Sequence, residues 1–342
     1  MDLRPLRDEL DGVPQNPVPR NHVRNIAFRV KRGLDFLGHS KPERARWLRQ
    51  INPYPKPWEH AEFRTEDGVQ IAGWYGPAKA DWGLVLVPGM FSTKDDTAHK
   101  RRAIRIWRKW KIPVMVIDMR AFGESTGIAT GGWKEALDIH AAAKELAARA
   151  GVQRVGVLAE SLGGAAAINA AAHDAASGSE LLHGGVLTYS AFVDTKDAVE
   201  YISAEPPKEH PFYIRWRGFG SLLSKRSDGH YHSFAAYMED AAKVHGIDLE
   251  ELYRLANPKW KVHMIHAPML CIHASDDPVV PIRHLRRMSR YAIDVPNIAT
   301  LTVPWGEHTG FEPMDSRWFW YVTRRFFETA NHTSLPNVEP EP

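Results

Sequence analysis

The chain has 342 residues, of which 44% are hydrophobic and 25% are charged, and its 44 basic and 41 acidic side chains leave a net charge of +3. This composition is that of a folded globular protein, which excludes a mainly disordered or collagen-like chain, and so balanced a charge gives no indication of nucleic-acid binding. The single cysteine, Cys271, excludes an intramolecular disulfide and argues against a cysteine-based zinc site.

The sequence contains no apolar run that approaches the roughly 18 residues of a membrane-spanning helix. The first twelve residues, MDLRPLRDELDG, also lack the apolar segment of a signal peptide. We therefore expect a cytoplasmic protein without an integral membrane span, and the single cysteine fits a reducing compartment.

Residues 1–60 are predicted to form an N-terminal helical extension. Residues 1–20 are rich in proline and charge, so we expect them to wrap the surface or to stay loose. Apolar side chains recur at helical spacing over residues 23–37, opposite a basic face, and a short helix is expected at 42–50. The first of these helices either packs on the main domain, which we favour, or contacts a membrane surface or a second subunit.

From residue 61 apolar strands alternate with helices, which is typical of a mostly parallel sheet covered on both faces. A hairpin is expected at residues 61–75. The strands that follow are expected at residues 84–87, 114–118, 155–159, 186–189, 269–273 and 299–303. Helices are expected at residues 95–110, 134–150, 162–172, 281–292 and 315–330.

The alternation is interrupted at residues 191–262, which are mostly helical in pattern and rich in aromatic side chains. We interpret this segment as a helical cap inserted over the carboxyl ends of the strands. It divides the core into residues 61–190 and 263–330, and residues 331–342 are expected to be a disordered tail.

The strongest local signal is the segment VGVLAESLGGAAA, which carries Ser161 between a predicted strand and a predicted helix. A serine in so tight a turn is held in a strained conformation with its hydroxyl above the sheet. Small residues are needed two positions before and after it, and Ala159 and Gly163 meet that need. The pattern favours a nucleophilic serine over a simple tight turn.

A serine nucleophile needs a general base that is oriented by an acid. His308 follows the strand expected at 299–303, and Asp277 follows the strand expected at 269–273. Because Ser161 also follows a parallel strand, the three side chains can meet at one edge of the sheet. Asp276 competes with Asp277, since either aspartate can cap the following helix while the other faces the histidine.

The segment LVLVPGMFS is expected to supply an oxyanion hole. Gly89 permits a sharp turn after the strand at 84–87, so the N–H of Met90 can point toward a substrate oxygen, with Phe91 as a further candidate. The N–H of Leu162, directly after the serine, is the second expected donor. We expect Phe91 and Glu160 to contribute to substrate binding.

Together, these segments resemble the α/β-hydrolase superfamily over roughly residues 61–330. The matching motifs are VPGM, DMRAFGES, AESLGG, SDDPVVP and GEHTGF, and the last two look most like the YheT-like branch of esterases. The resemblance implies an eight-stranded sheet with a cap after the sixth strand, and Ser161, His308 and Asp277 as nucleophile, base and orienting acid. The chain departs from the family at Pro88, where members carry histidine, and at Ala159, where they carry glycine.

The expected function is hydrolysis of a carboxylic ester or thioester through an acyl-Ser161 intermediate. The expected substrate is a small molecule with an apolar or aromatic group, and neither a cofactor nor a metal ion is expected. Alternatives are acyl transfer or C–C bond hydrolysis on the same three residues, or a non-catalytic binding protein. A homodimer is left open by the sequence.

Overall fold

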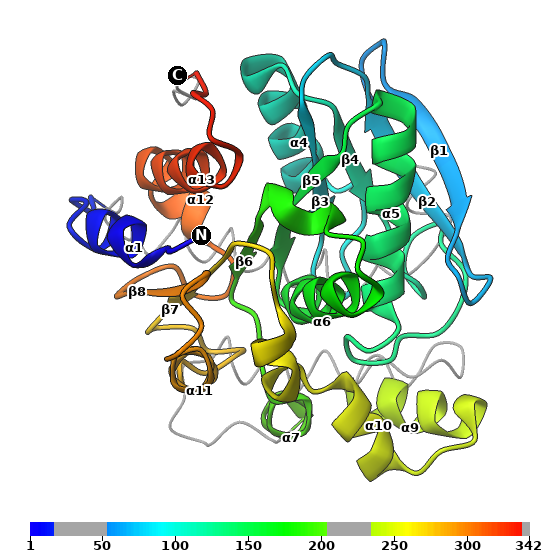
Figure 1. Ribbon diagram of the computed structural model, residues 1–342. Helices are drawn as coiled ribbons and strands as arrows, with labels where there is room; N and C mark the ends of the chain where they lie inside the picture. Colours follow the sequence, from blue (N-terminus) through cyan, green and yellow to red (C-terminus); the bar gives the residue numbers. More distant parts are fainter. Residues whose placement is uncertain (17–52, 204–233, 337–342) are drawn as a thin grey trace, which may run out of the picture.

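The computed structural model describes residues 1–16, 53–203 and 234–336 (Figure 1). The helices expected at 23–37 and 42–50 lie outside the described residues, as do five of the eleven aromatic side chains of the expected cap and the last six residues of the expected tail.

Eight strands form one sheet in the order β1-β2-β4-β3-β5-β6-β7-β8. The strands are β1 (Glu59–Arg64), β2 (Gln70–Gly76), β3 (Trp82–Val87), β4 (Val114–Ile117), β5 (Arg154–Glu160), β6 (Val186–Tyr189), β7 (Met269–Ala274) and β8 (Ile298–Val303). β1 and β2 form the expected hairpin, and β2 runs antiparallel to β4. The six strands from β3 to β8 are parallel to one another. The predicted mostly parallel, eight-stranded sheet is confirmed.

The central strands are largely apolar, and both of their faces are covered. Every residue of β3, β4, β6 and β7 is buried, whereas the edge strand β1 has only one buried position. Continuous apolar strands of this kind are the sequence signature of a parallel sheet between two helical layers.

Two hydrophobic cores lie on the two faces of the sheet. One contains side chains of α5 (Glu135–Ala150), α6 (Leu162–Ser177) and α11 (Arg283–Tyr291). The other contains side chains of α1 (Arg4–Asp11), α4 (Thr97–Trp110) and α13 (Ser316–Asn331), which follows the short α12 (Phe311–Met314). The helices therefore cover both faces, as the alternating pattern predicts.

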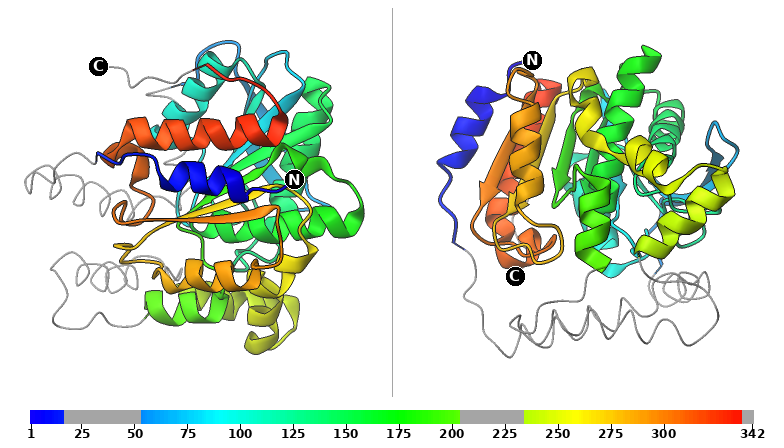
Figure 2. Two further views of the ribbon diagram at one scale, coloured as in Figure 1. Left: turned by 60° about the vertical axis from the view of Figure 1, so that its left-hand side comes forward. Right: turned by 90° about the horizontal axis from the view of Figure 1, so that it is seen from below.

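The first residues of the chain are helical rather than loose. Leu6 and Leu10 of α1 are buried against the core beside β8 and α13, and Glu9 forms an ion pair of 2.8 Å with Arg325 of α13. Figure 2 shows α1 lying alongside α13. The chain past α13 also packs on this helix as far as Leu335, which is buried and whose N–H donates to Glu328.

Between β6 and β7 the described residues are helical. They form α7 (Thr195–Ser203), α9 (Phe234–His245), α10 (Leu249–Ala256) and the 3₁₀ helix η2 (Pro258–Met264), which lie together next to α6 (Figure 1). The amide of Asn169 in α6 ties this segment to the core by donating to the carbonyl of Ala256. Within the described residues, no helix is both long enough and apolar enough to cross a bilayer.

Candidate active site

Ser161 occupies a sharp turn between β5 and α6. Its backbone has φ 54° and ψ −119°, a conformation that is strained for a residue with a side chain. The Ser161 N–H donates to the carbonyl of Tyr189 at the end of β6, at 2.9 Å. Gly163 has to be glycine here, because a Cβ atom would overlap the carbonyl oxygen of Pro88. The turn therefore needs the small residue that the sequence places two positions after the serine.

His308 and Asp277 form a hydrogen-bonded chain with Ser161. The His308 Nε2 atom lies 2.9 Å from Ser161 Oγ, and His308 Nδ1 lies 2.9 Å from Asp277 Oδ2. The three residues follow β5, β7 and β8, so their side chains converge at the carboxyl edge of the sheet. The structure thus brings together the three residues that the sequence singles out, in the order hydroxyl, imidazole, carboxylate.

The two adjacent aspartates have different partners. Asp277 is buried and faces His308, and its Oδ1 atom accepts the N–H groups of Val279 and Val280 at 2.8 and 2.9 Å. Burial alone would raise the pKa of Asp277, but His308 and His273 hold it well below its ordinary value. Asp276 instead accepts the backbone N–H of Glu307, at 2.8 Å, and so anchors the loop that carries the histidine.

The loop around His308 is held on both sides in an unusual backbone conformation. Glu307 and Thr309 have φ values of 46° and 58°, which are uncommon for residues with side chains. The Thr309 N–H donates to Ser190 Oγ, at 3.2 Å, from the end of β6. The sequence gives no sign of this role for Ser190, because its partner is remote in the chain and no motif includes it.

The loop after β3 passes next to Ser161. A Cβ atom at Gly89 would lie 3.1 Å from the Cβ of Ser161, so the backbone of Gly89, the residue before Met90, approaches the serine closely. Leu162 is the first residue of α6, and an N–H at this position has no acceptor within its own helix. The two N–H groups expected in the oxyanion hole therefore belong to backbone on either side of Ser161.

No family model matches the chain. Its fold is similar to that of the esterase Pf2001 from Pyrococcus furiosus, with a TM-score of 0.57 and 17% identity over 82% of this chain and 94% of the other. The α/β hydrolase GrgF from Penicillium gives a TM-score of 0.54 and 18% identity, covering 80% of this chain and 99% of GrgF. The chain has the α/β-hydrolase fold. A Pyrococcus horikoshii acylaminoacyl peptidase also matches 86% of the chain with 44% of its own length, at a TM-score of 0.53 and 16% identity.

On this α/β-hydrolase fold, the two residues expected to bind substrate have different surroundings. Phe91 belongs to a group of aromatic rings with Phe122 and with Tyr237 of α9, at centroid distances of 5.8 and 5.7 Å. Glu160 is buried, and its carboxylate lies 2.5 Å from the guanidinium of Arg102. Phe91 is thus placed among apolar side chains, whereas Glu160 belongs to an ion pair.

A buried lysine organises the loops beside the expected oxyanion hole. The Lys94 Nζ atom contacts the carboxylates of Asp118, Glu124 and Asp95 at 2.7, 2.7 and 3.0 Å. Asp118 also accepts the N–H groups of Lys94 and Glu124. The motif DMRAFGES therefore holds these loops in place, and no pattern in the sequence indicates that Lys94 is its partner.

Metal-ligating side chains gather away from Ser161. Among the described residues, one group of His, Cys, Asp or Glu side chains is close enough to share a metal ion, and it consists of Glu66, His140 and His173. His173 lies twelve positions after Ser161, about 18 Å along α6 at 1.5 Å per residue. This group is therefore separate from the hydrogen-bonded chain of Ser161, His308 and Asp277.

Proposed function

We propose that this protein is a serine hydrolase that cleaves a carboxylic ester or thioester. The observation that carries the proposal is the 2.9 Å contact between His308 Nε2 and Ser161 Oγ, with Asp277 on the other ring nitrogen. A serine hydroxyl at its ordinary pKa is a weak nucleophile, and an imidazole in this position can remove its proton as the oxygen attacks.

In the first half of the reaction, Ser161 Oγ bonds to the carbonyl carbon while His308 Nε2 takes the hydroxyl proton. The imidazolium is stabilised by the ionised carboxylate of Asp277, which also fixes the tautomer. The tetrahedral intermediate then expels an alcohol or thiol, which receives its proton from His308. In the second half, His308 removes a proton from water, and the resulting attack releases the acid and restores Ser161.

Negative charge develops on the carbonyl oxygen in both halves. The N–H groups of Met90 and Leu162 are proposed to bind it, helped by the positive end of the α6 dipole. Removal of one such donor costs roughly 3 kcal/mol of transition-state stabilisation in well-studied hydrolases. Backbone N–H groups donate whatever the neighbouring side chain is. Such an oxyanion hole is therefore compatible with Pro88 at the position where related α/β-hydrolases carry histidine.

The surroundings of Phe91 support an apolar or aromatic acyl or leaving group. Phe91 directly follows Met90 in the chain. Its ring packs with Phe122 and with Tyr237, which belongs to the inserted helices. Apolar walls with few polar groups are typical of small-molecule sites. We do not assign substrate contact to Glu160, because its carboxylate pairs with Arg102.

The resemblance of the motifs to α/β-hydrolases, including the YheT-like branch, supports acyl transfer chemistry. The similar structures include a protein named as an esterase and one named as an acylaminoacyl peptidase. We prefer an ester or thioester to an amide, since hydrolysis of an activated acyl group is the simplest reaction of these residues. A cytoplasmic location and a homodimer are also predictions from the sequence.

The proposal is tested with p-nitrophenyl esters and a fluorophosphonate probe. The wild type should hydrolyse the esters and label at Ser161, whereas Ser161→Ala should lose about 10⁴–10⁶ in kcat and all labelling. Equal rates for the two proteins, with no labelling of the wild type, would contradict the proposal and favour a non-catalytic binding protein. Product analysis with added alcohols then separates hydrolysis from acyl transfer, since a transferase yields the new ester.

A further inference from the structure

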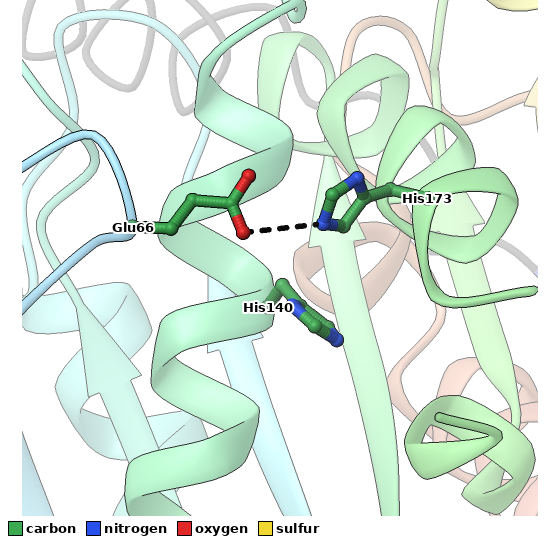
Figure 3. A group of neighbouring side chains, drawn as sticks. All are labelled: Glu66, His140 and His173. Carbon is green, nitrogen blue, oxygen red and sulfur yellow. Dashed lines mark ion pairs between the residues drawn. The ribbon is translucent and has the colours of Figure 1, made fainter. Parts of the chain in front are cut away.

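Glu66, His140 and His173 converge on one spot at the surface of the protein (Figure 3). Glu66 lies in the turn between β1 and β2, His140 lies on α5 and His173 lies on α6. One potential ligand atom from each residue lies within 4.8 Å of the other two, and His173 Nε2 is 3.7 Å from Glu66 Oε2. The imidazole rings of His140 and His173 are nearly perpendicular, with centroids 4.9 Å apart.

The ring of His140 is oriented by a buried carboxylate. His140 Nε2 lies 3.3 Å from Asp174 Oδ1 and 3.3 Å from Ser179 Oγ. Asp174 is itself fixed, because its Oδ2 atom accepts the N–H of Leu182 at 3.0 Å and Oδ1 accepts the hydroxyl of Ser179. Metal-ligating histidines are commonly held in this way, with one ring nitrogen on a carboxylate and the other on the metal. The Nδ1 atom of His140 is the one that this arrangement leaves for a ligand.

The turn that carries Glu66 is also fixed in place. Its neighbour Asp67 receives two hydrogen bonds from Arg120, at 2.9 and 3.1 Å, and Arg120 is bound on its other side by Asp138 of α5. The hydroxyl of Thr65 closes the turn by accepting the N–H of Val69 at 2.9 Å. The backbone of Glu66 is therefore anchored to the same helix that carries His140, so little order has to be created when an ion binds.

We propose that Glu66, His140 and His173 bind a divalent transition-metal ion of the Zn²⁺ class. Two imidazoles and one carboxylate suit Zn²⁺, whereas Mg²⁺ and Ca²⁺ prefer ligand sets made of oxygen. Ligands at about 2.0–2.1 Å in a tetrahedral site lie about 3.4 Å apart, so the 3.7 Å pair needs only a small contraction. The exposed side of the cluster, where Glu66 is 55% and His173 31% exposed, leaves the fourth position to water.

The bound ion would act as a clamp rather than as a catalyst. It joins the β1–β2 turn to α5 and α6, and it lies near the end of α6 that is remote from Ser161. The sequence gives no indication of this site, because the three proposed ligands are far apart in the chain and form no recognisable spacing. The proposal does not depend on the hydrolase function, since binding is measured without substrate.

The test is Zn²⁺ binding by the full chain in competition with a chromogenic chelator, after dialysis against EDTA. We expect the wild type to bind one Zn²⁺ that His173→Ala does not bind, and Glu66→Gln to bind it more than about tenfold less tightly. His263→Ala, which removes an exposed histidine outside the cluster, is the matched control and should bind as the wild type does. Millimolar Mg²⁺ or Ca²⁺ should not compete.

A second measurement separates loss of the site from loss of the fold. Saturating Zn²⁺ should raise the Tm of the wild type and of His263→Ala, but not that of His173→Ala, whose Tm without metal should match the wild type's. Co²⁺ should give the wild type the visible absorption of a site with nitrogen and oxygen ligands. His173→Ala should not show this absorption. If His173→Ala retains the wild-type stoichiometry and affinity for Zn²⁺, the proposed site does not exist.

Discussion

The guanidinium of Arg102 lies 2.5 Å from the carboxylate of Glu160, the residue directly before Ser161. The same guanidinium donates from Nε to Glu312 at 3.0 Å, and Glu312 lies on α12, just after the loop of His308. One buried cation on α4 therefore connects the turn of the nucleophile with the segment that follows the base. Burial alone would lower the pKa of Arg102, but the two carboxylates raise it above its ordinary value.

Replacing this cation should loosen the alignment of Ser161 with His308. Arg102→Ala removes a buried positive charge from beside the carboxylate of Glu160, so we expect a loss of about 3–5 kcal/mol in the free energy of unfolding. A small displacement of reacting groups lowers rates steeply, and kcat should fall by about tenfold to a hundredfold. Urea unfolding and ester hydrolysis measure the two effects. The neighbouring exposed Arg101→Ala should change stability by no more than about 0.5 kcal/mol, and an equal effect of both variants would contradict this role.

The contacts of the two aspartates predict different effects of two conservative substitutions. Asp277→Asn removes the carboxylate that holds His308 in the right tautomer, and kcat should fall by about 10⁴. Asp276→Asn keeps an oxygen that can accept the Glu307 N–H, so its kcat should stay within a few-fold of the wild type. Steady-state hydrolysis of a p-nitrophenyl ester by the two variants measures kcat. The reverse ranking would assign the orienting role to Asp276.

The sequence predicts those features of the fold that depend on local pattern. Apolar runs with helices between them indicate the sheet, and motifs at the ends of three strands place Ser161, Asp277 and His308 at one edge of it. The partners of buried charges, such as Arg102 for Glu160 and Lys94 for Asp118, are not predictable in this way. The pairing of buried charges depends on which helix packs against which strand. Neither the spacing of motifs nor the periodicity of apolar residues predicts that packing. The same limit applies to Ser190, which anchors the His308 loop from β6.

His284 should make the stability of the protein depend on pH. Its side chain is fully buried, and burial lowers the pKa of His284 to about 4. The nearby carboxylate of Asp197 opposes this shift, whereas His273, Arg287 and Arg283 reinforce it. Between pH 6.5 and 4 the unfolded chain therefore takes up a proton that the folded chain does not, and stability falls as the pH falls.

The size of this effect follows from the two pKa values, and it amounts to at most about 3 kcal/mol. Urea unfolding at pH 7, 5.5 and 4 measures it. His284→Gln should lose less stability than the wild type on acidification, whereas His266→Gln, at an exposed position, should follow the wild-type curve. Parallel curves for the wild type and His284→Gln would show that the buried imidazole does not cause the pH dependence.

Lys94 offers the sharpest test of whether a buried charge supports the loops around Ser161. Its ammonium lies among three carboxylates, and burial alone would lower the pKa of Lys94, but Asp118 and Asp95 raise it above its ordinary value. Lys94→Met keeps the length of the side chain but leaves the fully buried Asp118 without a counter-charge, so the free energy of unfolding should fall by about 3–5 kcal/mol. Asp118→Asn in the same chain removes that uncompensated charge and should restore part of the loss.

The exposed Lys109→Met is the matched control, and its free energy of unfolding should lie within about 0.5 kcal/mol of the wild type. If the double variant is no more stable than Lys94→Met, the loss comes from packing and not from the buried carboxylate.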